Sequence, residues 1–117
     1  RAKEAAKLAA IKTVNPALFR MARAVIEHHG DRVASRAWSA CDLVLAGDVE
    51  AGEGGAMVRS QSNAFARYQV TMAGRSCSCS CLDMGITLSN GTPVCKHILA
   101  TVFQLNLARQ AEQEPAY

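Results

Sequence analysis

The sequence predicts an α+β fold in which N-terminal helices precede a small antiparallel β unit and a C-terminal helix. Two patterns carry this prediction: apolar residues recur at helical spacing through residues 1–46, and period-2 alternation begins only after residue 56. A third observation is a group of cysteines and a histidine at the point where the last helical pattern starts. The length of 117 residues suits one small domain with a helical appendage.

The apolar residues of this chain are mostly small. Half of the residues are hydrophobic, but 21 of them are alanine, and aromatic residues make up only 5%. A short chain of this kind buries a modest core and commonly needs a disulfide or a metal as well. No apolar run reaches the ~18 residues of a membrane span. The charged start lacks both a Met and the apolar middle of a secretory signal, so we expect a cytoplasmic protein, or a nuclear one in a eukaryote, that begins downstream of its true start.

Three helices are expected before residue 47. The first twelve residues are mostly strong helix formers. Asn15 can cap a second helix, and Pro16 suits its first position, where a missing N–H costs nothing. A third helix is expected from about Arg32 to Ala46, and Gly47 ends it. The apolar stripe of the second helix is expected to hold Leu18, Met21, Ala22, Val25 and Ile26, and that of the third Val33, Ala37, Trp38, Cys41, Val44 and Leu45.

The rest of the chain combines loops, short strands and one last helix. Residues 47–56 are rich in glycine and acidic side chains without any period, which predicts a loop. Two strands are expected, with Tyr68, Val70 and Met72 facing one side of the second. These strands are Met57–Val58 and Phe65–Met72, joined around Ser60–Ala64. The final helix is expected from about Val94 or Cys95 to Gln110, with an apolar face of Ile98, Leu99, Val102, Phe103 and Leu105.

Four of the five cysteines lie within Cys77–Cys95. Residues two apart in an extended strand point to the same face, so the run Cys77, Cys79, Cys81 projects its thiols together. Cys95 and His97 converge if Cys95 precedes the helix and His97 lies in its first turn. Three thiolates and one imidazole form the closed tetrahedral shell of a structural zinc site. The spacing alone leaves two ligand pairs open, Cys77 with Cys79 or Cys79 with Cys81.

These residues resemble the SWIM zinc finger family. That family shows Tyr-x-Val, then Cys-x-Cys, a variable loop, and Cys-Lys-His leading into an aliphatic helix. The corresponding segments here are Tyr68-Gln-Val70, Cys79-Ser-Cys81-Leu82-Asp83-Met84 and Cys95-Lys96-His97-Ile98-Leu99-Ala100. The resemblance covers roughly residues 57–108 and implies a zinc-finger domain over about 57–110, following a helical region over 1–47. Leu82 and Met84 stand where the family usually has a proline and an aromatic residue.

The resemblance implies that zinc is bound by Cys79, Cys81, Cys95 and His97. Asp83 and Met84 match the family's downstream segment only with this pair of cysteines. The distance from Val70, in contrast, suits Cys77 and Cys79 somewhat better. In the preferred register Cys77 is a spare thiol beside the site, whereas Cys41 is expected to be an ordinary buried side chain.

Charge and family together favour a nucleic-acid partner. Residues 1–37 carry a net charge of +5, residues 38–55 carry −4 and residues 56–117 carry +2, which gives the total of +3. SWIM-like modules occur in SNF-type ATPases, Mutator-type transposases and partners of recombinases, which implies DNA rather than RNA and a place in a larger DNA-processing protein or complex. The expected contact residues are Arg59, Arg67, Arg75 and Lys96.

Two other functions are weighed against this one. A protein adaptor would present the second helix, through Leu18, Met21, Val25 and Ile26, to a partner helix or groove. A redox enzyme would use the cysteine run, but a thioredoxin-like pair is Cys-x-x-Cys and would leave Cys95 and His97 unexplained. We find neither a Ser/His/Asp set nor a glycine-rich phosphate loop, and therefore expect a protein without catalytic activity.

Overall fold

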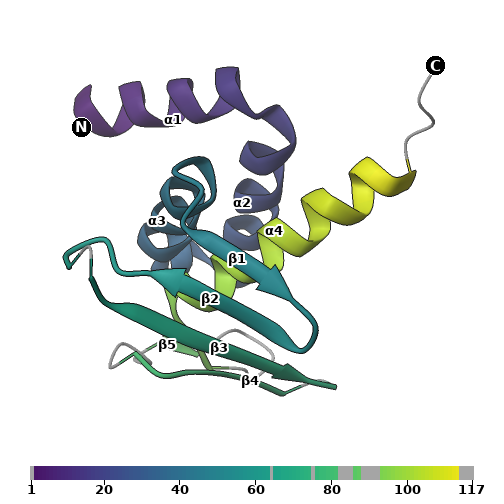
Figure 1. Cartoon of the computed structure of the whole chain (residues 1–117). Helices are drawn as coiled ribbons and strands as arrows, with labels where there is room; N and C mark the ends of the chain where they lie inside the picture. Colours follow the sequence, from purple (N-terminus) through teal and green to yellow (C-terminus); the bar gives the residue numbers. More distant parts are fainter. Residues whose placement is uncertain (1, 64, 75, 82–85, 88–92, 114–117) are drawn as a thin grey trace.

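The computed structural model describes residues 2–63, 65–74, 76–81, 86–87 and 93–113. It confirms the α+β fold, with helices on one side of a small antiparallel sheet (Figure 1). The helices are α1 (Ala2–Val14), α2 (Pro16–His29), α3 (Ala34–Leu45) and α4 (Lys96–Gln113), with a 3₁₀ turn, η1 (Asp31–Val33), before α3. Among the described residues, no helix is both long and apolar enough to span a membrane.

The start of α2 forms as its sequence predicts. Asn15 is the N-cap, and its side-chain oxygen accepts a hydrogen bond from the Leu18 amide at 3.1 Å. Pro16 occupies the first turn, where no intrahelical donor is needed. At the other end, Gly30 has a φ of 95°, a backbone conformation that glycine adopts without strain. These two ends fix the length of α2 and turn the chain towards α3.

The sheet has four antiparallel strands in the order β1-β2-β3-β4. They are β1 (Val49–Gly52), β2 (Gly55–Arg59), β3 (Arg67–Ala73) and β4 (Ser76–Cys79). A separate pair, β5 (Ile86–Thr87) and β6 (Pro93–Val94), leads into α4. The expected strand positions are correct in outline, although Phe65 lies in the loop before β3 instead of within the strand.

The prediction of a loop over residues 47–56 is wrong, because β1 and the start of β2 form a hairpin there. Only Glu53 and Gly54 separate the two strands, and Gly54 has a φ of 77°. Gly55 is equally necessary, since a Cβ at this position would lie 1.9 Å from the Val70 carbonyl oxygen. The glycines that suggested a loop therefore make a tight turn and a close strand pair.

One face of the sheet is buried and the other is exposed. Tyr68, Val70 and Met72 point inwards from β3, as their alternation predicts, and Val58 does so from β2. Helix α4 contacts all four strands on this inner side and also packs on α3. Its residues Ile98, Leu99 and Phe103 are buried there. The core thus lies between α4, the sheet and α3.

The apolar stripe of α2 packs inside the molecule. Leu18 is fully buried, and Met21, Val25 and Ile26 are partly buried against the core. The sequence prediction that this stripe presents itself to a partner is therefore not supported. Trp38 is buried as expected, and its ring lies 5.5 Å from that of Phe19.

Candidate metal centre

Strand β4 places two thiols on the inner face of the sheet. Cys77 lies opposite Met72, and Cys79 lies opposite Val70, which is fully buried. The strand is held at its end, where the Ser80 amide donates to the Gln69 carbonyl at 3.0 Å. Cys81 follows directly and is 9% exposed. Because side chains alternate along a strand, Cys77 and Cys79 lie on the same side, as their spacing predicts, and Cys81, beyond the end of β4, lies close to Cys79.

The start of α4 supplies the other two members of the site. Cys95 lies between β6 and the helix, and its carbonyl accepts the Leu99 amide at 3.1 Å. His97 lies in the first turn, and its carbonyl accepts a hydrogen bond from the Thr101 hydroxyl at 2.9 Å. Cys95 thus precedes the helix and His97 lies in its first turn. This is the arrangement in which two residues at this spacing can converge.

Four possible ligand atoms meet at this point. One atom each from Cys79, Cys81, Cys95 and His97 lie within 4.8 Å of one another, and the described residues contain no other such group. The Cys95 sulfur is 3.7 Å from Nδ1 of His97. In a tetrahedral zinc site, ligand atoms lie about 3.5–3.8 Å apart, because Zn–S is ~2.3 Å and Zn–N is ~2.0 Å. The cluster can therefore hold a metal ion after a small contraction.

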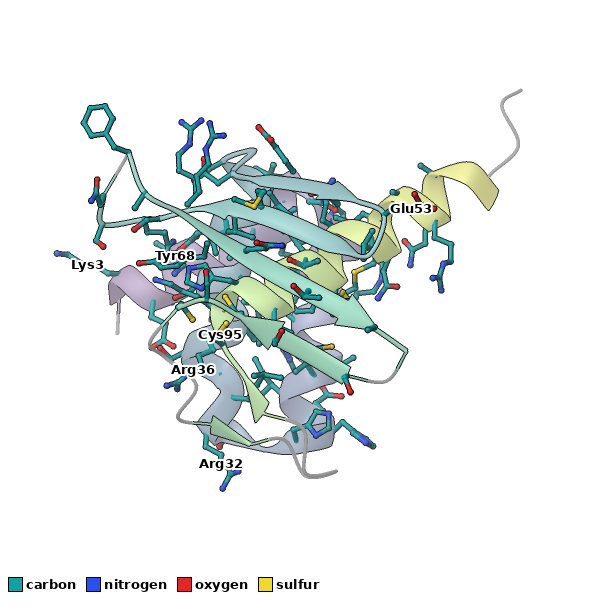
Figure 2. All side chains as sticks on the ribbon, turned by 60° about the horizontal axis from the view of Figure 1, so that its bottom comes forward. Lys3, Arg32, Arg36, Glu53, Tyr68 and Cys95 are labelled. Atoms are coloured by element: carbon teal, nitrogen blue, oxygen red, sulfur yellow. The ribbon has the colours of Figure 1, made fainter. Side chains whose placement is uncertain are left out.

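Figure 2 shows sulfur atoms gathered beside the labelled Cys95, with Tyr68 close by. The Tyr68 ring packs on the His97 ring at a centroid distance of 4.5 Å and an interplanar angle of 38°. His97 is 3% exposed, and its Nε2 is the one buried side-chain nitrogen or oxygen of the described residues without a hydrogen-bond partner. A buried imidazole with few hydrogen bonds destabilises a fold unless another interaction compensates. Metal ligation through Nε2 would be such an interaction, whereas ligation through Nδ1, the atom 3.7 Å from the Cys95 sulfur, would leave Nε2 without a partner.

Hydrogen bonds already stabilise negative charge on sulfur in the cluster. The Cys95 thiol donates to Cys79, and the Cys81 backbone N–H does so as well, which lowers the pKa of Cys79. The pKa of Cys95 is raised to about 12, because this thiol donates to Cys79 and is buried. The Ile98 backbone N–H opposes this by donating to the Cys95 sulfur. Amide donors of this kind are typical partners of metal thiolates.

The two other cysteines lie outside the cluster. Cys77 is half-buried on β4 and is not among the four clustered residues. Cys41 is fully buried in α3, and this burial raises the pKa of its thiol to about 12. Because Cys41 belongs to the apolar core and lies outside the group of possible metal ligands, it behaves as a small apolar side chain. This is the packing role that the sequence predicts for Cys41.

The predicted nucleic-acid residues lie at different places. Arg59 and Arg67 are directly opposite each other on β2 and β3 and are exposed on the outer face. The Arg59 Nε is 4.0 Å from a carboxylate oxygen of Asp48. Lys96 is half-buried in the first turn of α4, and Arg75 lies outside the described residues. The structure therefore brings two of the four, Arg59 and Arg67, together on neighbouring strands.

Comparisons with protein families, with curated proteins and with solved structures find no match to this chain. The likeness to SWIM zinc fingers consequently rests on its own residues. Support for a metal site therefore comes from the geometry of this chain, in which a Cys₃His cluster lies between a β-strand and the start of a helix. The sequence placed Tyr68 on the inner face but did not reveal its contact with His97. That contact depends on how α4 lies across the sheet, which no local pattern records.

Proposed function

We propose that the chain is a non-catalytic zinc module that binds nucleic acid, with DNA preferred to RNA, within a larger DNA-processing protein or complex. The observation that carries the proposal is the convergence of Cys79, Cys81, Cys95 and His97. Three thiolates and one imidazole fill a tetrahedral zinc shell and leave no position for a reactive water. The zinc then acts structurally, by joining β4 to α4.

Zinc binding is tested by replacing the cysteines singly with serine and measuring bound zinc per chain. Cys81→Ser is expected to lose stoichiometric zinc, because it removes one of the four clustered donors. Cys77→Ser is the matched control on the same strand and is expected to keep one zinc per chain. Loss of zinc with Cys77→Ser and retention with Cys81→Ser would show that the other pair of cysteines binds the metal.

The paired arginines support nucleic-acid binding. Like charges directly opposite each other in a sheet are unfavourable, and Arg59 and Arg67 form such a pair on the exposed face. A phosphate between two guanidinium groups would remove the repulsion and release counterions. The helix α1 adds Lys3 and Lys12, whereas Lys7 is 2.7 Å from an Asp42 oxygen and is already paired.

The binding test is a titration of the zinc-loaded chain with a fluorescent oligonucleotide at several salt concentrations. Affinity is expected to fall steeply with salt, since each phosphate contact contributes roughly 0.7–0.9 to the log–log slope. The double variant Arg59→Ala/Arg67→Ala should reduce that slope by about 1.4–1.8, the share of two contacts. Arg109→Ala, at an exposed position near the end of α4, is the charge-matched control and should leave the slope nearly unchanged. Absence of binding at low salt, or binding that ignores salt, would overturn the proposal.

A further inference from the structure

The described residues between β2 and β3, 60–63 and 65–66, are joined by hydrogen bonds of their own. The Ser60 amide donates to the Ala66 carbonyl at 2.9 Å, which closes the loop at its base. The buried Ser60 hydroxyl oxygen accepts the Asn63 amide at 3.1 Å, and the Ala66 amide donates to the Asn63 carbonyl at 3.0 Å. Serine and asparagine side chains commonly fix turns in this way. These hydrogen bonds therefore fix the backbone of residues 60–63 and 65–66 relative to one another.

This ordered loop carries an aromatic ring that the fold does not use. The Phe65 amide donates to the Asn63 side-chain oxygen at 3.0 Å, so the backbone position of Phe65 is fixed. Its side chain is nevertheless 98% exposed. Other aromatic side chains of the described residues pack against a neighbouring ring, as Phe19 does against Trp38 and Tyr68 against His97. An apolar ring held in solvent on a fixed loop is suited to contact another molecule.

Positive charge lies at the base of the same loop. Arg59 ends β2 and Arg67 begins β3, so the two opposed guanidinium groups flank the segment that carries Phe65. Residues 60–66 contain no acidic side chain. The Arg59 Nε lies 4.0 Å from a carboxylate oxygen of Asp48, which is a long ion pair. One aromatic face and two cations suit a ligand in which flat apolar rings are joined by anionic groups. The ring of Phe65 would stack on a ligand ring, and the two guanidinium groups would pair with the anions.

The candidate metal centre contacts the start of β3, the strand that follows this loop. Tyr68 follows Arg67 on β3 and points inwards, where its ring packs on His97. The inner side of β3 is thus attached to the cluster, while its outer side carries Arg67. Binding of a metal by His97 would fix the position of β3, which begins directly after the loop.

From these contacts we infer that Phe65 stacks on an unpaired base of single-stranded nucleic acid while Arg59 and Arg67 contact the adjacent phosphates. This inference rests on the proposed function and names the form of nucleic acid and the contacting ring. Stacked bases in a duplex offer no free face, whereas unpaired bases stack on exposed aromatic side chains. A phenyl ring has no polar atom to read a base edge, so the contact is expected to tolerate any base sequence.

The test compares a labelled single-stranded oligothymidylate with a duplex of the same length, by fluorescence anisotropy at fixed salt. Phe65→Ala is expected to weaken single-strand binding by about tenfold to a hundredfold, the range measured for loss of one stacking ring. Duplex affinity should change less than threefold. The salt slope should stay as in the wild type, because no charge is removed.

Two variants make the result specific to stacking. Phe65→Trp should retain single-strand affinity, and its added fluorescence should be quenched when the oligonucleotide binds. Val14→Ala removes another exposed apolar side chain, 70% exposed at the end of α1, and should bind like the wild type. An unchanged thermal midpoint for Phe65→Ala would verify that the fold is intact.

The outcomes separate this inference from the proposed function. Normal single-strand binding by Phe65→Ala, with loss in the double arginine variant, would overturn the stacking role and leave nucleic-acid binding in place. No binding by the wild type to either oligonucleotide would overturn both. Phe65-dependent binding to anionic lipid vesicles, without an effect on oligonucleotides, would assign the ring to a membrane surface and likewise overturn the inference.

Discussion

The helical part of the molecule, α1–α3, and the sheet part, β1–β4 with the first turn of α4, use the same residue type in opposite ways. In the helical part, Cys41 is fully buried among apolar side chains, and its pKa is raised to about 12. In the sheet part, Cys79 accepts hydrogen bonds from Cys95 and from a backbone amide, and its pKa is lowered. The pKa of Cys95 in the same cluster is also raised to about 12, so the difference lies in the neighbours: Cys41 packs in the apolar core, whereas Cys79 and Cys95 lie beside Cys81 and His97 as possible metal ligands.

The two parts also differ in the size of their apolar cores. The helical part buries Leu18, Val33 and Leu43 completely. The strands bury only small residues on their inner face, namely Ala56, Val58 and Val70. Beyond these, the inner face consists of half-buried rings and sulfur atoms. Ile98, Leu99 and Phe103 of α4 cover this face, but the strands add few large apolar side chains of their own. We infer that the sheet depends more than the helices on the ligand bonds of the proposed metal site.

Metal removal is the strongest test of this difference. A chelator should unfold the sheet and the first turn of α4, because structural zinc contributes on the order of 10 kcal/mol to a small fold. Amide hydrogen exchange should then become fast throughout β2, β3 and β4 and stay slower in α2 and α3. Adding zinc back should restore the original exchange rates.

The cluster variants make the chelator experiment specific. Cys81→Ser should show fast exchange in the sheet even with zinc present, whereas Cys77→Ser should behave like the wild type. Equal protection in both parts after complete zinc removal would contradict a role of the metal in holding the sheet. Equal loss in both parts would show that the helices also depend on the metal.

A substitution in the helical core tests the other half of the comparison. Leu43→Ala should lower the free energy of unfolding by about 3 kcal/mol, because a buried leucine leaves both lost transfer energy and a cavity. Zinc stoichiometry of the folded protein should remain at one. Leu45→Ala is the matched control, since Leu45 lies on the same helix but is 39% exposed, and it should cost much less. Urea denaturation with saturating zinc measures both values. Similar losses at the two positions would mean that α3 is not packed as described.

Local signals predicted the helices and the ligand-bearing segments. Asn15 with Pro16 marked the start of α2, and the alternation of Tyr68, Val70 and Met72 identified the inner face of β3. These features depend on residues close in sequence, so a periodic pattern records them. The Cys-x-Cys and Cys-x-His spacings likewise indicated that two of the cysteines in the run 77–81 would converge with Cys95 and His97, and the family resemblance selected Cys79 and Cys81.

Features that depend on distant segments were missed. The hairpin of β1 and β2 was not predicted because its residues are small or acidic and do not alternate. It forms because β2 pairs with β3 and because Gly55 has no Cβ to clash with the Val70 carbonyl. The contact of Tyr68 with His97 joins β3 to α4. The exposure of Phe65 was also missed, because the same aromatic residue fits a buried strand equally well by pattern.

The smallest expected effect concerns the pH dependence contributed by Cys41. Its pKa is about 12 in the folded chain against an ordinary value of 9.0, so the folded state holds this proton more tightly. The stabilisation is therefore complete below pH 9 and is lost as the pH rises from 9 towards 12. The loss amounts to about 1.4 kcal/mol per pH unit, or about 2 kcal/mol at pH 10.5. Urea denaturation of zinc-saturated wild type and Cys41→Ala at pH 8 and 10.5 isolates this contribution, because every other group titrates in both proteins. Between pH 8 and 10.5 the free energy of unfolding of the wild type should fall by about 2 kcal/mol more than that of the variant. Equal losses in the two proteins would show that Cys41 ionises freely and is not the packed thiol that distinguishes the helical part from the sheet.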